Sequence, residues 1–340
     1  MMNKLFTLLA VLVVFQTAQA QQKLCIAFYN QENLFDTIDD KHKNDNEFLP
    51  TAKKQWDTQK YFNKLNHMAT VISSMNNQKG PDVIGMCEVE NKAVVEDMAK
   101  TDLLKSGKYT VVHFEGPDER SIDNALMFKS NVFKLVQSQA FSIHFADFPN
   151  SKTRDILMVR LETKSKAQLV VLVNHFPSRL GGEEASEPKR YAAAQTLRNI
   201  CDSLLAKNGQ ENIVIMGDFN DEPTNRSMDS VLRAKANEYD LNNGNLFNAM
   251  YELKQNGEGS HFYKGHFSML DQIILSSSLT NCTGKICYEK SSATIYKQPF
   301  MVEAEGKYKG APLRTFVGEK YINGYSDHLP VFITLVLKKK

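Results

Sequence analysis

Continuous apolar runs alternate with amphipathic stretches along this chain, and polar residues gather where the apolar runs end. The clearest runs are Leu169 to Val173, Ile213 to Met216 and Leu329 to Leu337. A strand that is apolar at successive positions has both faces covered, so these runs predict strands in the middle of a layered domain. Two other stretches, Gln59 to Met75 and Lys189 to Leu205, carry apolar residues at helical spacing and predict amphipathic helices. The apolar face of the first helix is expected to hold Phe62, Leu65, Met68, Ala69 and Ile72.

The remaining pattern predicts further strands, one further helix and long irregular segments. The strands are expected at Lys23 to Tyr29, Asp82 to Met86, Tyr109 to Phe114, Asp123 to Phe128, Val132 to Phe141, Ile156 to Leu161 and Ser268 to Leu275. A helix is expected at Lys92 to Leu104, while Ile38 to Thr58 and Ser276 to Lys320 are polar and irregular. The order strand, helix, strand between Leu169 and Met216 indicates a unit whose loop residues gather at the carboxyl ends of its strands.

The stretch from Ile213 to Asp221 joins a buried strand to a polar turn. Gly217 allows the backbone to turn sharply or to approach a ligand closely. Asp218 and Asn220 are two residues apart, so their side chains point the same way if the extended geometry continues through the turn. An ordinary Asx turn at the end of a strand explains the same residues, and this stretch alone does not decide between the two interpretations.

Similar polar side chains stand at the ends of the other apolar runs. An ionised Glu88 directly after the run Val83 to Cys87 is costly to bury unless it is paired, and a cation is its natural partner. A lone histidine in such a position is more often structural. Cores rarely place several acids and histidines at the ends of their most apolar strands unless these meet, so together they predict one pocket. The set comprises Asn30, Glu88, His175, Asp218, Asn220, Asp271, Asp327 and His328.

The residue types in this set indicate a chemistry. Carboxylates, amides and imidazoles without a thiolate suit a hard cation such as Mg²⁺ or Mn²⁺ and an oxygen-rich substrate. Hydrolysis of a phosphate ester needs a cation to neutralise phosphate charge, a base to orient or deprotonate water, and donors for the charge that develops at phosphorus. The set therefore predicts a metal-dependent phosphoesterase.

The N-terminus predicts export. A single lysine precedes an apolar run from Leu5 to Phe15, and Ala18-Gln19-Ala20 has the small-x-small form that a signal peptidase cuts. We expect a signal peptide over residues 1–20 and a secreted or periplasmic location. No other stretch is long enough to span a bilayer, so stable membrane insertion is not expected.

Composition adds little beyond a globular class. The chain has 340 residues, of which 42% are hydrophobic and 24% charged, and it can bury a substantial core. A formal net charge of +2 does not indicate a nucleic-acid binder, although it does not exclude one. Among five cysteines, Cys25 and Cys87 are expected in the core, whereas Cys282 and Cys287 are candidates for a local disulfide in an oxidising compartment.

Six segments resemble the ordered motifs of the endonuclease/exonuclease/phosphatase superfamily: FYNQENLFD, GMCEVEN, VNHFPSR, GDFND, MLDQIIL and YSDHLPV. They follow the order of that family from Asn30 to His328, and the pairing of GDFN with a later SDH is specific. The resemblance implies a single α/β domain over residues 21–340. Its expected architecture is a four-layer α/β/β/α sandwich of two stacked mixed sheets, as in deoxyribonuclease I, with the site at one end.

The resemblance also implies how a cation and a water molecule are held. Glu88 resembles the main metal-binding glutamate, with Asn30 beside it and Asp327 contributing to the same or a second cation, expected to be Mg²⁺ or Mn²⁺. Asp218 is similar to the acid that orients or deprotonates the attacking water. Asn220 is similar to the amide that holds this water or the phosphate.

The remaining roles implied by the resemblance concern the phosphate. His328 would contact it, with Asp271 fixing the tautomer of the ring. His175 looks like the histidine that stabilises or protonates the leaving group. Arg154 and Arg179 are further candidates for phosphate contacts, although a surface ion pair is the favoured interpretation of Arg154.

The substrate is less well defined than the chemistry. The motif GDFND lacks the Asn-Tyr-Arg ending of the inositol-phosphatase branch, and the single tryptophan, Trp56, stands in a polar loop and offers no aromatic clamp for an abasic site. Export fits attack on extracellular DNA or RNA, or on a phospholipid head group, better than DNA repair. A nuclease is the favoured interpretation, and a monomer is expected. A sphingomyelinase-like or small-molecule phosphoesterase is the alternative. A non-catalytic binding protein on a degenerate fold is a third reading, against which the intact acids and histidines argue.

Overall fold

The computed structural model describes residues 21–241 and 244–338, so the expected signal peptide lies outside the described residues. Two mixed sheets form its centre. The first has the order β14 (Ile286–Tyr288), β18 (Val331–Leu337), β1 (Gln22–Leu34), β2 (Val83–Val89), β4 (Asp123–Lys129) and β3 (Tyr109–His113), with β15 (Thr294–Ile295) joined to β18. The second has the order β5 (Phe133–Phe141), β6 (Ile156–Thr163), β7 (Gln168–His175), β8 (Ile213–Asp218), β13 (Asp271–Leu275), β10 (Leu246–Asn248) and β9 (Ala234–Lys235).

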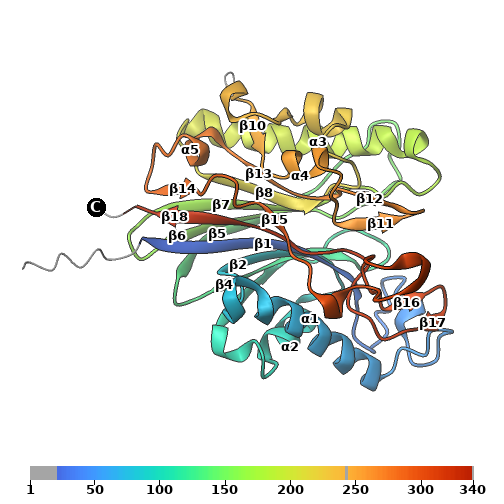
Figure 1. Ribbon diagram of the computed structural model, residues 1–340. Coiled ribbons are helices and arrows are strands. Elements are labelled where there is room, and N and C mark those ends of the chain that lie inside the picture. Colours follow the sequence, from blue (N-terminus) through green and yellow to red (C-terminus); the bar gives the residue numbers. More distant parts are fainter. Residues whose placement is uncertain (1–20, 242–243, 339–340) are drawn as a thin grey trace, which may run out of the picture.

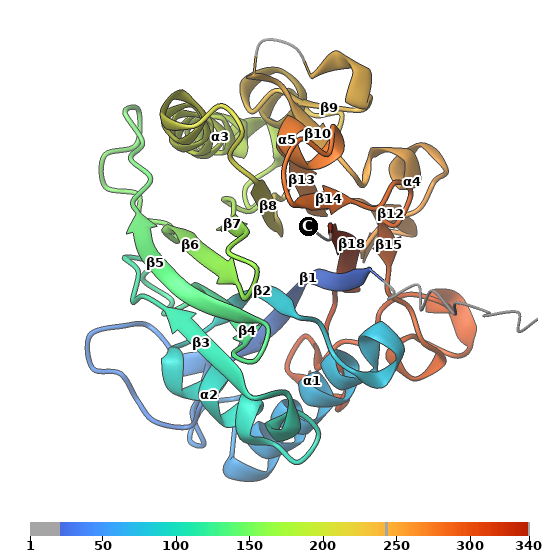
Figure 2. The same cartoon turned by 90° about the vertical axis from the view of Figure 1, so that its left-hand side faces the viewer.

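The two sheets stack face to face, and helices cover their outer faces (Figure 1). The helices α1 (Thr58–Gln78) and α2 (Lys92–Lys100) lie on the first sheet, and α3 (Glu183–Lys207) lies on the second. The end view in Figure 2 shows these layers in the same sequence. The predicted α/β fold with two stacked mixed sheets is confirmed.

Strand β8 shows why its sequence is apolar at every position. Val214 and Met216 belong to the core between the sheets, whereas Ile213 and Ile215 belong to the core beneath α3. Successive side chains of a strand point to opposite faces, so both faces of a covered strand need apolar residues. Each such residue is fully buried and contributes roughly 1.5–3 kcal/mol through the removal of its side chain from water.

Strand direction brings the polar strand ends together. β7 and β8 are parallel and joined through α3, and β1 and β2 are also parallel. β13 is antiparallel to β8, and β18 is antiparallel to β1. As a result β1, β2, β7 and β8 end, and β13 and β18 begin, at the same edge of the sandwich. The hairpins β11–β12 (His261–Tyr263, His266–Ser268) and β16–β17 (Phe316–Val317, Lys320–Tyr321) lie at this end (Figure 1).

Several predicted boundaries need correction. α3 begins at Glu183, six residues before the predicted start, and continues through Pro188. α2 ends at Lys100 and not at Leu104. The segment from Ser276 to Lys320 is not wholly irregular, since it contains α5 (Ser277–Thr280), β14 and β15; the short α4 (Tyr251–Gln255) precedes it. In α1 the ring of Phe62 is 51% exposed, and Tyr61 points into the core instead. No helix in the described ranges is both long and apolar enough to cross a membrane.

The cysteines are thiols. Cys25 and Cys87 are buried, as expected for small core residues. Cys282 and Cys287 are both free, so the local disulfide considered above is not formed. The Cys282 thiol lies 3.9 Å from the carbonyl oxygen of Leu279.

Trp56 lies in a small aromatic core and not in a solvated loop, which corrects the prediction for its segment. Its side chain is fully buried, and its indole N–H donates to the carbonyl oxygen of Phe35 at 3.0 Å. The ring packs against Phe48 and Phe316, each with a centroid distance of 5.9 Å. The long loop after β1 is therefore anchored by an aromatic cluster that links it to the hairpin β16–β17.

Replacing Trp56 with alanine should destabilise the protein strongly, because a large cavity and an unpaired Phe35 carbonyl would remain. We expect a loss of about 3–5 kcal/mol in the free energy of unfolding, measured by chemical denaturation and circular dichroism. Phe62→Ala provides the control, since Phe62 is 51% exposed and its truncation should change stability by less than about 0.5 kcal/mol. Equal stability of the two variants would contradict the aromatic core.

Candidate active site

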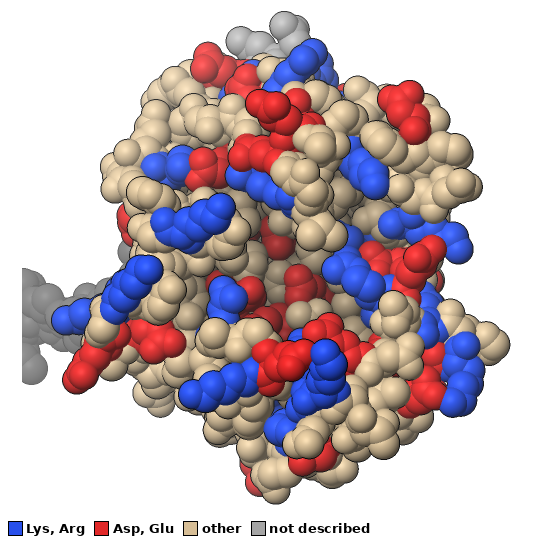
Figure 3. Space-filling model, turned by 90° about the vertical axis from the view of Figure 1, so that its right-hand side faces the viewer, with Lys and Arg blue, Asp and Glu red and all other residues tan. Residues whose placement is uncertain are grey.

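The site lies in a hollow at the edge where the polar strand ends meet. Figure 3 faces this end and shows acidic side chains at the floor of the hollow and both basic and acidic side chains around its rim. The floor is formed by residues that end β1, β2, β7 and β8 and by residues that begin β13 and β18. All eight residues of the predicted pocket stand at this edge.

Local backbone irregularities aim the first two strands at the hollow. The pairing of β1 with β2 shifts register between Asn30 and Leu34, and the pairing of β2 with β4 shifts between Cys87 and Val89. Glu88 has a positive φ of 57°, a conformation that L-residues rarely adopt. Such bulges turn a side chain that would otherwise follow the pleat, and they are common beside active sites.

Glu88 and Asn30 form one part of the site. The Asn30 side-chain amide donates to Glu88 Oε1 at 3.2 Å and to Asp218 Oδ2 at 3.1 Å, and the Asn33 backbone N–H donates to Glu88 Oε2 at 3.1 Å. Burial raises the pKa of Glu88, and repulsion from Asp327 raises it further. Glu88, Asp327 and Asn30 offer carboxylate and amide oxygens, and such a donor set fits a hard divalent metal ion.

Asp327 completes this set less directly. Its carboxylate lies 3.8 Å from Arg314 Nη2 and 4.0 Å from His328 Nε2. Burial opposes its ionisation, but the positive charges of His328 and Arg314 keep its pKa below the usual value, so Asp327 is a carboxylate. The structure therefore brings Asn30 and Glu88 into contact. Asp327 makes no hydrogen bond to either of them within the described residues, but its charge acts on Glu88.

Asp218 is held at the centre of the floor. An added Cβ at Gly217 would stand 2.3 Å from the carbonyl oxygen of Asn174, so glycine is required here by the neighbouring strand and not by a ligand. Asp218 Oδ1 accepts from the Asn220 backbone N–H at 2.9 Å, which is the Asx turn considered above. Asn220 has a φ of 49°, so the extended geometry does not continue, and its amide donates to the Phe176 carbonyl at 3.0 Å. Burial raises the pKa of Asp218 to about 7.

His328 and Asp271 form a hydrogen-bonded pair. His328 Nδ1 lies 2.6 Å from Asp271 Oδ2, and Nε2 on the other side of the ring lies 3.8 Å from Asp218 Oδ2. Burial favours the neutral ring, but the negative charges of Asp271 and Asp218 raise the pKa of His328 well above its usual value. The predicted role of Asp271 in fixing this ring agrees with the geometry, because a carboxylate can only accept from Nδ1–H.

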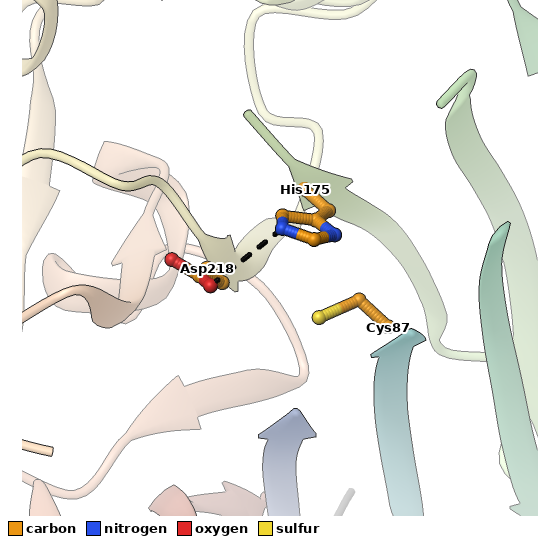
Figure 4. Close-up of side chains that lie close together, drawn as sticks. All are labelled: Cys87, His175 and Asp218. Atoms are coloured by element: carbon orange, nitrogen blue, oxygen red, sulfur yellow. Dashed lines mark ion pairs between the residues drawn. The ribbon is translucent and has the colours of Figure 1, made fainter. Parts of the chain in front are cut away.

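His175 differs from His328 in its charge. Its Nε2 lies 3.7 Å from Asp218 Oδ2 and 3.9 Å from Glu88 Oε1, and Figure 4 shows the ring converging with Asp218 and Cys87. Burial lowers its pKa well below the usual value, and Arg154 acts in the same direction. Its Nδ1 has no hydrogen-bond partner within the part of the chain that the structure describes. Burial also raises the pKa of the Cys87 thiol, so the sulfur stays protonated.

The two predicted arginines support the site from behind. Arg154 is buried and not at the surface; it pairs with Asp118 at 3.2 Å and donates to the carbonyl oxygen of Phe176 at 2.5 Å. Arg179 donates to the carbonyl oxygen of Asn220 at 2.7 Å and pairs with Glu183 at 3.0 Å. These donors are used within the protein, so both arginines hold the loops after β7 and β8, and their contact with a phosphate stays a prediction.

Lys64 is a buried lysine near the site that the sequence pattern did not single out. It lies on α1, is almost fully buried, and stands 3.7 Å from Glu32 Oε2. Its ammonium donates to Thr315 Oγ1 at 2.7 Å and to the carbonyl oxygen of Tyr325 at 2.6 Å. Lys64 follows Tyr61 by three residues and so lies on the apolar face of the helix. This spacing could have predicted that Lys64 is buried and has polar partners in the interior.

His261 was also missed. Its ring packs on that of His328 with centroids 4.6 Å apart, and the two residues form an isolated β-bridge. Burial and the nearby charge of His328 lower the pKa of His261 to about 4, so its ring is neutral. A single histidine in a short polar hairpin carried no signal in the sequence.

Comparison with known proteins identifies the family. The model of the endonuclease/exonuclease/phosphatase family matches residues 25–337. The chain belongs to this family. Members of the family are phosphoesterase hydrolases, including nucleases and phosphatases, and they generally use a divalent metal ion. No curated protein matches the chain by sequence.

Solved structures share the fold at low identity. A family protein from Bacteroides thetaiotaomicron is 16% identical with a TM-score of 0.56, over 94% of this chain and 100% of that chain. The D. rerio TDP2 complexed with single-strand DNA product is 16% identical with a TM-score of 0.54, over 92% of this chain and 98% of that chain. A mannosyl-6-phosphatase from Bacteroides thetaiotaomicron is 15% identical with a TM-score of 0.54, over 92% and 100% of the respective chains. At these identities the likeness establishes the fold alone.

Replacing Asp271 with asparagine should lower the pKa of His328 and slow hydrolysis of a phosphate ester. The amide keeps a partner for the ring but removes the charge that favours its protonated form. We expect kcat to fall roughly 10- to 100-fold, and the His328 ring to titrate at lower pH by NMR. Asp82→Asn serves as control, because Asp82 pairs with Lys129 at the other end of β2 and should leave the His328 titration unchanged. An unaltered titration in Asp271→Asn would refute this role.

Proposed function

We propose that this protein is an exported phosphodiesterase that depends on Mg²⁺ or Mn²⁺ and hydrolyses nucleic acid. The observation that carries the proposal is the geometry of the floor, where a charged histidine, a central carboxylate and a metal-type donor set converge in an open hollow. Each part matches a requirement of phosphate-ester hydrolysis with water as the nucleophile.

The donor set and the central carboxylate have different tasks. Glu88 and Asn30, with Asp327, would hold a divalent cation, which when bound neutralises phosphate charge. Asp218 faces the same space and is suited to orient a water molecule and to take its proton, since its pKa of about 7 matches a neutral working pH. The Asn30 side-chain amide donates to both Glu88 and Asp218, so it fixes the metal-binding carboxylate relative to the water-activating carboxylate.

The two histidines would act on the phosphate. His328 keeps its proton because of Asp271, and its Nε2–H points into the hollow, where it can donate to a phosphate oxygen. His175 is neutral, and its Nε2, which lies 3.7 Å from Asp218 Oδ2, can hydrogen-bond a further oxygen of the ester. Both rings therefore stand beside Asp218, where the phosphate would lie.

Two pockets near the floor offer room for the two ester groups of a phosphodiester. One, of about 530 Å³, lies by the loop after β7 and is lined in part by Arg120, Lys152 and Lys189. The other, of about 610 Å³, lies by His261 and is lined in part by Lys264, Lys307 and Arg314. A phosphate with groups on two sides can use both pockets, and basic residues in each suit a polymer of phosphates.

Two alternative functions fit the same floor. A sphingomyelinase-like or small-molecule phosphoesterase would hydrolyse another substrate there, and a binding protein would bind a ligand there without turnover.

Export is inferred from the N-terminal sequence alone. N-terminal sequencing of the exported protein tests it, and Gln21 is the expected first residue.

Substitutions at Glu88 and Asp218 should separate metal binding from turnover. Glu88→Ala should abolish binding of Mg²⁺ or Mn²⁺ in calorimetry and with it most activity, because it removes the buried charge of the donor set. Asp218→Ala should leave metal binding largely intact and lower kcat roughly 10²- to 10⁴-fold, as expected for loss of a general base. Near-normal rates in both variants would refute the mechanism.

The mature protein should cut DNA or RNA in the presence of Mg²⁺ or Mn²⁺ and not in EDTA. The test compares plasmid DNA, RNA, sphingomyelin and a chromogenic phosphodiester, with Asp218→Ala as the blank. We expect affinity for nucleic acid to fall steeply with salt, because several phosphates are neutralised together. Activity on the lipid or the chromogenic ester alone would replace nucleic acid with another substrate. Inactivity on all four would favour a phosphomonoester or a binding role.

A further inference from the structure

We propose that a pocket beside His328 binds the nucleobase next to the scissile phosphate. This hairpin pocket lies between the hairpin β11–β12 and the segment 303–317 and has a volume of about 610 Å³. Tyr263, Lys264, Lys307, Tyr308 and Arg314 are among its lining residues. The inference rests on the proposed function, since it assigns a substrate group to the same site.

Both walls of the hairpin pocket are fixed to the catalytic floor. On the hairpin side, Ser260 accepts from the backbone N–H of Leu329 at 2.7 Å and, through Oγ, from that of Asp271 at 3.1 Å. On the other side, the Thr315 N–H donates to Glu32 Oε2 at 2.7 Å, and Lys64 donates to Thr315 Oγ1 at 2.7 Å. A group that fills the hairpin pocket is therefore held at a defined position relative to the reacting phosphate.

A row of rings leads from the floor into the hairpin pocket. The His328 and His261 rings have centroids 4.6 Å apart, and the His261 and Tyr263 rings have centroids 6.4 Å apart with planes inclined by 23°. Tyr263 thus stands two ring contacts away from the histidine assigned to the phosphate. A base attached to the adjoining sugar can continue this row by stacking on Tyr263.

The chemistry of the hairpin pocket suits a base flanked by phosphate. Tyr263 and Tyr308 are 61% and 54% exposed, so their ring faces are open to a ligand that stacks on them. Lys264 lies 5.3 Å from the Tyr263 ring centroid and Lys307 lies 5.6 Å from that of Tyr308. Aromatic faces stack bases of any sequence, and adjacent lysines neutralise the phosphates that follow.

The test measures binding of adenosine 5′-monophosphate and of ribose 5-phosphate, two ligands that differ only by the base. Calorimetry with Mg²⁺ in the Asp218→Ala background avoids turnover. We expect the nucleotide to bind on the order of tenfold more tightly than the sugar phosphate, as stacking of one base implies. Adding Tyr263→Ala should remove this preference, and Tyr263→Phe, which retains the ring, should keep it.

The outcomes separate the two proposals. Equal affinity for both ligands, or a preference that survives Tyr263→Ala, would overturn the base-binding role even if the protein cuts nucleic acid. A preference that depends on the Tyr263 ring would support it whatever the polymer assay shows. Failure of the proposed function would appear instead as absence of nucleic-acid cleavage by the wild-type protein.

Discussion

The burial of several carboxylates at one edge of the sandwich is the constraint on which the rest of the structure depends. Asp271 is compensated by His328, and Asp218 receives hydrogen bonds from Asn30 and from the Asn220 backbone. Glu88 remains under-compensated, since its pKa is raised by burial and by Asp327. A buried charge without a full partner is costly, so the apolar cores on both sides of each sheet must stabilise a floor that the protein alone does not neutralise.

The compensation extends into the interior through Lys64. This residue sits beneath Glu32 and holds Thr315 and the carbonyl of Tyr325, two residues before Asp327. Burial and repulsion from Asp327 raise the pKa of Glu32 to about 7, which shows that negative charge is in excess here as well. One buried lysine thus links α1, the loop after β1 and the segment before β18, and it sets where the acids of the first sheet stand.

The fold and the floor could be predicted because each follows from strand-level rules. Ile213 to Met216 is apolar throughout because its residues alternate between two cores, and this pattern identifies a central strand. His175 and Asp218 could be placed together because β7 and β8 are parallel and end at one edge. The spacing of apolar residues does not indicate that His328 lies near Asp218. The resemblance of the GDFN and SDH motifs to those of the family indicated it.

Other features could not be predicted because they depend on tertiary contacts. The positive φ of Glu88 arises from the register shift between β2 and its neighbour, and no residue in the segment demands it. Arg154 was expected at the surface, yet its guanidinium is buried against Asp118 because the loop before β6 folds inward. Trp56 stands among polar residues in sequence, and only the approach of Phe316 from a distant hairpin makes its surroundings apolar.

The difference between the floor and its rim explains why the chemistry is easier to assign than the substrate. Floor residues stand on strands packed on both faces, where a change of position would disrupt a core. The hairpin β11–β12 and the segment 303–317 are joined to that floor by a few hydrogen bonds and expose their aromatic rings. Such segments can vary without loss of the fold. We therefore expect substrate choice to depend on rim residues such as Tyr263. The role of such a residue follows from its neighbours in space and not from a sequence motif.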